Sequence, residues 1–391
     1  MIVIADDITG AAEIAGIAHA AGQQAHLVCA AGPLYCDTVA VPPRPASSTV
    51  YCDTVAVPPR PAASTVYCDS VAVTTVIATD TRSMSEPEAA AETRRIASAI
   101  SHHTSPIFKK TDSALRGHVV AELTALMDVT GYQRAVYLPA NPSKGRIIRK
   151  GIYYINEIPI HETAFNYDPE FPARTSSLRE RFPDAEAKGI IMPDAESEDD
   201  IRRIIRQYDD GKTIFAGAAD LFTLIPPISP ISPITPISPI SPITTPTTLI
   251  LCGSTQSKPL NLGIPISPMP REVYDGEQGA DYWFQSLATP ATSLILTIPH
   301  THRTGKEVAV HLRTVMAEMA QRLVSKHRPD HLIIEGGATA WATLQALGWT
   351  DFRIVSQIAP GVVQMSATNG TLVTLKPGSY PWGNLFQSFS E

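Results

Sequence analysis

The chain has 391 residues, of which 44% are hydrophobic and 18% charged, so its length predicts two domains with sizeable cores. The formal net charge of −7 implies no basic face, and we expect neither nucleic acid nor a membrane surface as a partner. No apolar run reaches membrane-spanning length, and Asp6 interrupts the first one where a signal peptide would continue. The five cysteines have no metal-binding spacing, and a cytoplasmic location is expected.

The chain begins with a short apolar segment, 2–4, that predicts a buried strand. A helix is expected to follow, with Thr9 as its N-cap and Gly22 just after its end. Asp6 and Asp7 then lie at the carboxyl end of a strand, where open α/β sheets bind ligands. Adjacent carboxylates there need a cation, a proton or a ligand hydroxyl to compensate them. The alternative interpretation is a solvated acidic turn.

Two low-complexity tracts interrupt the chain. The sixteen-letter segment YCDTVAVPPRPASSTV at 35–50 returns at 51–66 with one change, which indicates a tandem duplication inserted in a surface connection. Proline then recurs at every third position between 227 and 242, the period of a polyproline II helix, and we interpret 226–248 as an interdomain linker. The alternative for each tract is a motif that binds a partner.

Strands alternate with helices on both sides of the linker. This alternation predicts an α/β fold with two domains, 1–225 and 249–391, each a mostly parallel sheet flanked by helices, with a ligand cleft between them. The expected strands are 25–29, 71–79, 107–108, 135–138, 189–192, 213–216, 249–252, 293–298, 331–334, 352–358 and 371–375. The expected later helices are 87–102, 119–129, 198–208 and 306–327.

Three strand ends in the second half carry glycine, at 253–254, 336–339 and 376–378. Glycine allows backbone N–H groups to approach phosphate oxygens, and Thr339 falls near a helix N-terminus with its partial positive charge. Each site alone indicates only a turn, but three in one domain predict a nucleotide site. The sequence contains no P-loop, no dinucleotide-binding fingerprint and no zinc-binding pattern.

The densest polar cluster of the first half is KKTDSALRGH at 109–118. Lysine and arginine at this spacing can hold a carboxylate, and arginine can do so through two parallel hydrogen bonds. The alternative is a helix N-terminus with exposed charges. Arg146, Asp168 and the segment 161–163 are weaker candidates, because each suits an ordinary polar loop.

The motifs IADDITGAAE, KKTDSALRGH, LPANPSKGR, GSTQS, EGGATA and TLKPGS occur in this order, and together they resemble those of the four-carbon acid sugar kinase family. The resemblance covers almost the whole chain apart from the two tracts. It implies a sugar-acid-binding domain, a nucleotide-binding domain and phosphorylation of threonate, erythronate or 3-oxo-tetronate by ATP. One departure is that Ala338 stands where the family usually has glutamate, while Glu335 precedes the two glycines.

The resemblance also implies roles for individual residues. Asp7 is the first choice to orient or deprotonate the attacking hydroxyl, and Asp112 the second. Lys110 and Arg116 are expected to bind the substrate carboxylate, while Mg²⁺ rides mainly on the phosphates, assisted by one carboxylate of the protein. The other implied contacts are Asp6, Thr9 and Ser113 for the sugar acid and Ser254, Gly336, Gly337, Thr339 and Gly378 for ATP.

Two other functions stay open on the sequence. One is a sugar-acid sensor that has kept the fold and lost turnover. The other is a dehydrogenase or isomerase of sugar acids, against which the missing dinucleotide fingerprint counts. The expected partner is a small-molecule sugar acid, and a homodimer is compatible with the sequence.

Overall fold

The computed structural model describes residues 1–30, 73–101, 103, 105–168, 171–226, 247–254, 260–287, 293–299, 305–378 and 380–387. The tandem repeat expected at 35–66, and all but the ends of the linker expected at 226–248, lie outside these residues. The domain boundaries on either side of the linker therefore stay predictions.

The first half of the chain forms a parallel sheet, as the alternation of strands and helices predicted. Its strand order is β2-β3-β1-β4-β10-β5-β9, and every neighbouring pair in it is parallel. The strands are β1 (Ile2–Ala5), β2 (Gln24–Cys29), β3 (Val73–Ala78), β4 (Ile107–Lys110), β5 (Arg134–Leu138), β9 (Ile190–Ile191) and β10 (Thr213–Gly217).

The second half continues the same sheet in the order β12-β13-β11-β14-β17-β16-β15. The pairs from β12 to β17 are parallel, and β16 and β15 form an antiparallel hairpin beside them. The strands are β11 (Thr248–Cys252), β12 (Ile266–Pro268), β13 (Ser293–Thr297), β14 (His331–Glu335), β15 (Asp351–Ala359), β16 (Val362–Ala367) and β17 (Leu372–Lys376).

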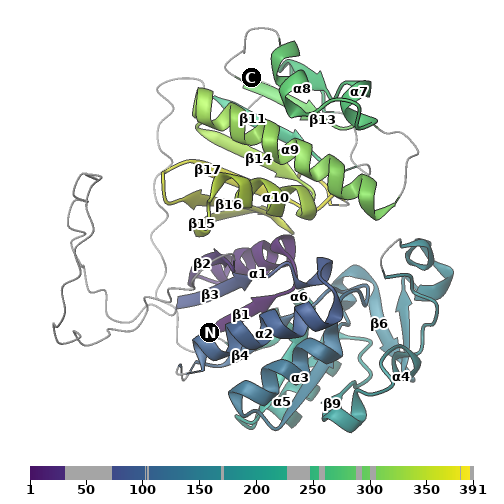
Figure 1. Cartoon of the computed structure of the whole chain (residues 1–391). Coiled ribbons are helices and arrows are strands. Elements are labelled where there is room, and N and C mark those ends of the chain that lie inside the picture. The colour runs from purple at the N-terminus through teal and green to yellow at the C-terminus, as the bar shows by residue number, and fades with distance from the viewer. Residues whose placement is uncertain are drawn as a thin grey trace, which may run out of the picture.

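The two halves join edge to edge, which corrects the expectation of two separate sheets (Figure 1). Strand β15 pairs antiparallel with β2, from Asp351 opposite Val28 to Arg353 opposite His26. The physical reason is the hairpin: β15 keeps one free edge after pairing with β16, and an exposed strand edge readily pairs with another strand.

Helices cover the sheet, and α1 lies between the two halves (Figure 1). It packs against β15 and β16 as well as against β2 and β3. The helices are α1 (Ile8–Ala20), α2 (Glu86–Ile100), α3 (Val119–Thr130), α4 (Leu178–Arg181), α5 (Glu198–Tyr208), α6 (Ala219–Leu224), α7 (Arg271–Tyr274), α8 (Ala280–Ser286), α9 (Lys306–His327) and α10 (Gly337–Leu347). The bounds predicted for α9 are confirmed.

Short elements complete the described chain. A small antiparallel sheet consists of β6 (Arg146–Arg149), β7 (Ile152–Ile155) and β8 (Ile158–Pro159). The 3-10 turns are η1 (Thr81–Ser83), η2 (Pro142–Lys144), η3 (Ile160–Glu162), η4 (Ala164–Tyr167) and η5 (Glu186–Lys188). Within the ranges given above, no helix combines the length and the apolar character that crossing a bilayer requires.

The start of α1 differs from the prediction by two residues. Asp7, not Thr9, is the N-cap, because Ile8 and Thr9 are already helical and the Asp7 carboxylate accepts the backbone N–H of Gly10 at 2.8 Å. The Thr9 hydroxyl donates to the same carboxylate at 2.8 Å. Gly22, with φ 82°, follows the C-cap as predicted.

Candidate active site

Arg82 organises the charged side chains at the carboxyl ends of the first-half strands. From η1, just after β3, its guanidinium donates two parallel hydrogen bonds to Asp6, at 3.1 and 2.9 Å. A third bond reaches Asp7 Oδ2 at 3.0 Å, and Asp112 Oδ1 lies 3.7 Å from the same nitrogen. Arg82 is therefore the cation that the adjacent carboxylates required.

Arg82 is not among the site residues predicted from the sequence. A signal was present, because β3 and β1 are parallel neighbours and the carboxyl ends of such strands meet at one edge of the sheet. The duplicated tract separates the two strands in the sequence, so their pairing could not be read from chain order.

The ionisation of Asp7 follows from its surroundings. Burial opposes its charge, but Arg82, Lys110 and the bonds from Thr9 and Gly10 outweigh burial and lower the pKa of the carboxyl. Asp7 is therefore a carboxylate at neutral pH, and it can accept a hydrogen bond from a ligand hydroxyl.

Asp112 is held more tightly than Asp7. Arg116 donates to both of its oxygens, at 3.0 and 2.9 Å, and the backbone N–H of Ala114 donates at 2.8 Å. Burial opposes its charge, yet Arg116 and Arg82 hold its pKa well below the ordinary value. A carboxylate so compensated is a weak proton acceptor, which favours Asp7 over Asp112 as the group facing a hydroxyl.

Two arginines flank an aromatic ring beside this pair. The guanidinium carbons of Arg116 and Arg146 each lie 5.9 Å from the ring centroid of Phe165, and Arg146 donates to the hydroxyl of Ser113. Asp168 lies 3.6 Å from Arg116. The Arg116 side chain is 32% exposed, so it can still meet a ligand anion.

Lys110 faces inward. Lys110 is only 4% exposed, and its ammonium donates to the carbonyl of Thr111 at 2.9 Å. The same ammonium lies 3.7 Å from the carboxylate of Glu13 on α1. Its neighbour Lys109 is fully buried against Glu122, at 2.7 Å. Arg116 and Arg146 are thus better placed than Lys110 to bind a substrate carboxylate.

The three glycine sites of the second half form one rim. A methyl group added at Gly253 would overlap the side chain of Thr339, and one at Gly378 would overlap Ser254. Gly336, at φ 98°, would place a methyl group 3.6 Å from the backbone of Gly253. Thr339 is only 4% exposed, so its side chain shapes the rim from within.

Glu335 lies beneath this rim and does not reach its surface. It is fully buried at the end of β14, where Lys376, its neighbour on β17, donates to it at 2.5 Å. Lys376 also donates to the carbonyl of Gly378 at 3.0 Å and lies 4.7 Å from the ring centroid of Trp382. The pair therefore anchors the loop that carries Gly378.

The charged side chains of the first half, Asp6, Asp7, Arg82, Asp112 and Arg116, form a charged rim, which meets the glycine rim at Gly337. A methyl group on this first residue of α10 would lie 3.2 Å from Thr9 Oγ1 and 3.6 Å from Asp7 Oδ2. Adjacent strands rotate by roughly 20–25°, so the six steps from β1 to β14 turn the strand direction by well over a right angle. This twist, with the reversal in the hairpin, accounts for the meeting of strand ends from the two halves.

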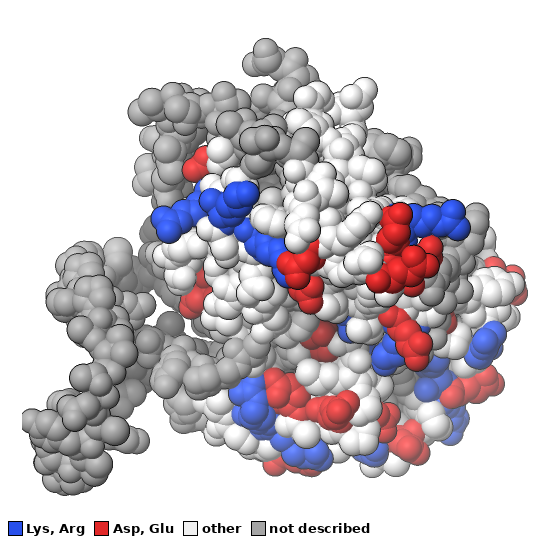
Figure 2. Space-filling model, turned by 45° about the horizontal axis from the view of Figure 1, so that its top comes forward, with Lys and Arg blue, Asp and Glu red and all other residues white. Residues whose placement is uncertain are grey.

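The residues fit a magnesium ion only as one carried by phosphates. Over the described ranges, histidine, cysteine, aspartate and glutamate form no group of three or more that could hold a metal. Acidic and basic side chains are interspersed on the face shown in Figure 2, without a large field of one sign.

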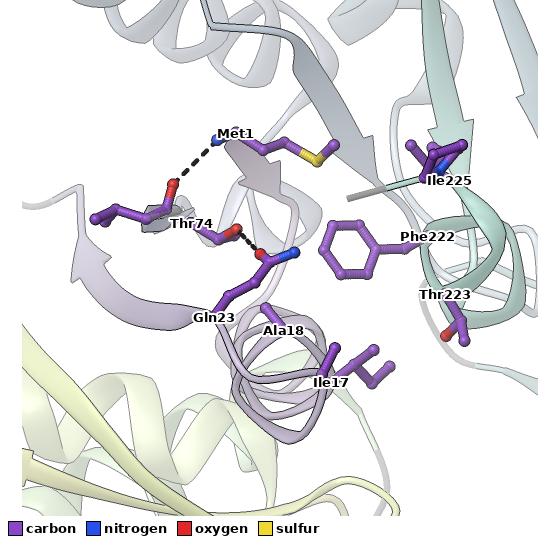
Figure 3. Close-up of a pocket in the computed structure, with 11 residues that line it drawn as sticks. Met1, Ile17, Ala18, Gln23, Thr74, Phe222, Thr223 and Ile225 are labelled. Atoms are coloured by element: carbon purple, nitrogen blue, oxygen red, sulfur yellow. Dashed lines mark hydrogen bonds between the residues drawn. The ribbon is translucent and has the colours of Figure 1, made fainter. Parts of the chain in front are cut away.

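A cavity of about 90 Å³ lies away from these rims (Figure 3). Met1, which precedes β1, and Val73, the first residue of β3, line it together with Ala18 and Phe222. It is therefore at the amino-terminal edge of the sheet, whereas the charged cluster is at the carboxyl edge. The cavity and the charged cluster are therefore separate.

Comparison with known proteins agrees with the division of the site between a first half with charged side chains and a second half with glycines. Residues 1–185 match the family model of a sugar-binding N-terminal domain, and residues 289–380 that of a nucleotide-binding C-terminal domain. A D-threonate kinase of Salmonella typhimurium is 25% identical over 346 residues, covering 73% of this chain and 79% of that protein. A D-erythronate kinase of Heliobacterium modesticaldum is 35% identical over 98 residues, 25% of this chain and 22% of that one.

The fold also matches a solved structure. The crystal structure of Haemophilus influenzae protein HI1011 aligns with a TM-score of 0.62 at 19% identity, covering 100% of this chain and 99% of that one. The sugar-binding domain match, the nucleotide-binding domain match and the kinase relatives agree with the motifs of both rims. The chain belongs to the four-carbon acid sugar kinase family.

Proposed function

We propose that this protein transfers the terminal phosphoryl group of ATP to a hydroxyl of a four-carbon sugar acid such as threonate or erythronate. The observation that carries the proposal is the approach of Gly337, on the glycine rim, to Asp7 and Thr9, on the charged rim. Phosphoryl transfer requires a donor and an acceptor site in contact, and little covalent chemistry from the protein.

The acceptor site lies at the charged rim. Arg116 and Arg146 bind the carboxylate of the sugar acid, and the hydroxyl of Ser113 accepts a hydrogen bond from Arg146. Asp7 accepts a hydrogen bond from the hydroxyl that attacks. Arg82 is a positioning residue, because it holds Asp6 and Asp7 in place.

The donor site lies at the glycine rim. Backbone N–H groups near Ser254, Gly337 and Gly378 face the phosphates, and the N-terminus of α10 adds its partial positive charge. Mg²⁺ would neutralise phosphate charge while bound mainly to the nucleotide. Since ATP is the donor, we place the reaction in the cytoplasm.

The hydroxyl oxygen of the sugar acid forms a bond to the γ-phosphorus, the bond from that phosphorus to the β,γ-bridging oxygen breaks, and ADP leaves with the electron pair. The proton of the attacking hydroxyl passes to Asp7 or through it to solvent.

A coupled assay of ADP release tests the proposal with D- and L-threonate, D- and L-erythronate and 3-oxo-tetronate. We expect acid-dependent ADP release with at least one of them. ATP-independent binding of an acid without turnover would indicate a sensor, and acid-dependent reduction of NAD(P) would indicate a dehydrogenase. Either result, without ADP release, would contradict the kinase assignment.

A further inference from the structure

Lys144 occupies the junction of the two rims, although neither its sequence motif nor the roles above assign it a function. It is the last residue of η2, which follows β5 in the first half. Its ammonium donates to Glu13 Oε1 on α1 and to the hydroxyl of Tyr380, both at 2.7 Å. Tyr380 belongs to the second half and follows Gly378 by two residues, so Lys144 contacts both halves.

The packing around Lys144 holds this position. Glu13 lies one helical turn beyond Thr9 on α1, and helical side chains point back toward the N-terminus of their helix. The ring of Tyr380 packs on Gly361, where an added methyl group would be 2.5 Å from it, and its centroid is 4.5 Å from the Lys144 ammonium. The cation is therefore directed at the first turns of α1.

The other lysines near the rims are committed to buried partners. Lys109 and Lys376 are 0% and 2% exposed in their side chains, and each is paired with a buried glutamate. Lys110 is 5% exposed on the same measure, whereas the side chain of Lys144 is 27% exposed. Lys144 can therefore contact a ligand between the two rims while Glu13 and Tyr380 hold its ammonium in place.

We infer that Lys144 binds the terminal phosphate of the nucleotide at the point of transfer. The inference rests on the proposed kinase function, and it deepens it. Charge that develops on the transferring phosphoryl group needs a fixed cation between donor and acceptor. Lysine suits this position because Glu13 and Tyr380 hold its stem in place, while the partly exposed ammonium can still donate to a phosphate oxygen.

The charge state of Lys144 is consistent with this role. Burial opposes its charge, but Glu13 and the hydroxyl of Tyr380 outweigh burial and raise the pKa of the ammonium above its ordinary value. Lys144 therefore stays protonated at neutral pH, whether or not nucleotide is bound.

Calorimetry with two probes, MgADP and the magnesium complex of the β,γ-imido analogue of ATP, tests the inference without requiring turnover. We expect Lys144→Met to weaken binding of the imido analogue by about tenfold or more, the effect of losing one charge-assisted hydrogen bond, and to leave ADP binding within about twofold. Lys144→Arg should recover most of the loss. Lys188→Met, at an exposed lysine of η5, is the matched control.

A purely structural bridge between the halves predicts a different result. In that case Lys144→Met would weaken the binding of both nucleotides by the same factor. Tyr380→Phe, which removes the bridging hydroxyl but keeps the cation, would have the same effect. Two results with Lys144→Met would overturn the role of Lys144 but not the kinase assignment. One is an equal loss of affinity for both nucleotides, and the other is an unchanged affinity for the imido analogue in a variant whose melting temperature is unchanged. Failure of the unmodified protein to bind either nucleotide would overturn the kinase assignment itself.

Discussion

The charged rim and the glycine rim consist of different kinds of residue. The first-half rim consists of charged side chains in fixed pairs, with Arg82 bonded to Asp6 and Asp7 and Arg116 bonded to Asp112. The second-half rim consists of glycines whose missing side chains make room for their neighbours. A small polyol acid must be distinguished by placed charges, whereas phosphates can be held by backbone N–H groups. Substitutions should therefore act differently on the two sides.

The largest effect is expected at Asp7. Asp7→Asn should lower kcat by about 10²–10⁴-fold, because the amide cannot accept the hydroxyl proton, and it should leave nucleotide affinity nearly unchanged. A coupled assay and calorimetry with MgADP measure the two quantities. Asp184→Asn, at an exposed aspartate, is the control. A variant that retains more than about a tenth of kcat would contradict the role of Asp7.

Stability should depend on the charged rim more than on any exposed ion pair. Arg82→Met leaves Asp6 buried without its partner, and we expect it to lower the free energy of unfolding by about 3–5 kcal/mol. Arg94→Met, which removes an arginine 51% exposed, should change it by less than about 0.5 kcal/mol. Urea denaturation measures both, and equal losses would break the distinction between the two sites.

Asp80 should add a pH dependence to the first-half rim. Burial raises its pKa to about 6, against partial compensation by the hydroxyl of Ser83 and by Arg313. Above pH 6 the Asp80 carboxyl is charged in the folded protein, and because burial disfavours this charge, it lowers the free energy of unfolding. This destabilisation disappears as the pH falls from 6 toward about 4, the pKa of the carboxyl in the unfolded chain, because the folded protein then binds the proton.

Asp80→Asn removes that contribution. The variant should be more stable than the unmodified protein at pH 8, by at most about 3 kcal/mol, and the difference should close near pH 4. Asparagine tolerates the left-handed backbone at φ 53° and can still accept the Ser83 hydroxyl. Unfolding at the two pH values measures the difference, and a difference independent of pH would contradict the assignment.

The glycine rim should show the smallest effect. Gly378→Ala forces a methyl group against Ser254, and overpacking of this kind costs about 1–3 kcal/mol. We expect about a tenfold loss of MgATP affinity, with sugar-acid affinity unchanged. Gly279→Ala, where an added methyl group meets no atom within 4 Å, is the control. A loss of sugar-acid affinity instead would reverse the roles of the two rims.

Local patterns predicted most elements but not how they join. The long helix 306–327 and the strands that end just before Asp6, Gly253 and Gly336 follow from apolar periodicity and from the glycines that follow strands. The expected strands 352–358 and 371–375 leave out β16, because proline and glycine at 360–361 are typical of the end of a strand and also of the turn of a hairpin. The hairpin of β15 and β16, which joins the two halves, was therefore not predicted either.

The sequence motifs predicted residues for the candidate site, but not which of them contact one another. The motifs identified Asp7, Asp112 and Arg116, yet Arg82 and Lys144 act through partners far away in the sequence, 76 residues from Asp6 in one case and 236 from Tyr380 in the other. Such pairs follow from strand order and twist, which one sequence without its fold does not specify.

The most direct test of the meeting of the two rims is a crystal structure with the β,γ-imido analogue of ATP, Mg²⁺ and a four-carbon sugar acid bound together. The account predicts the γ-phosphorus about 3–3.5 Å from the hydroxyl that faces Asp7, with the acid carboxylate at Arg116 and Arg146. A nucleotide bound with its terminal phosphate directed away from Asp7, or an acid bound outside the charged rim, would contradict it.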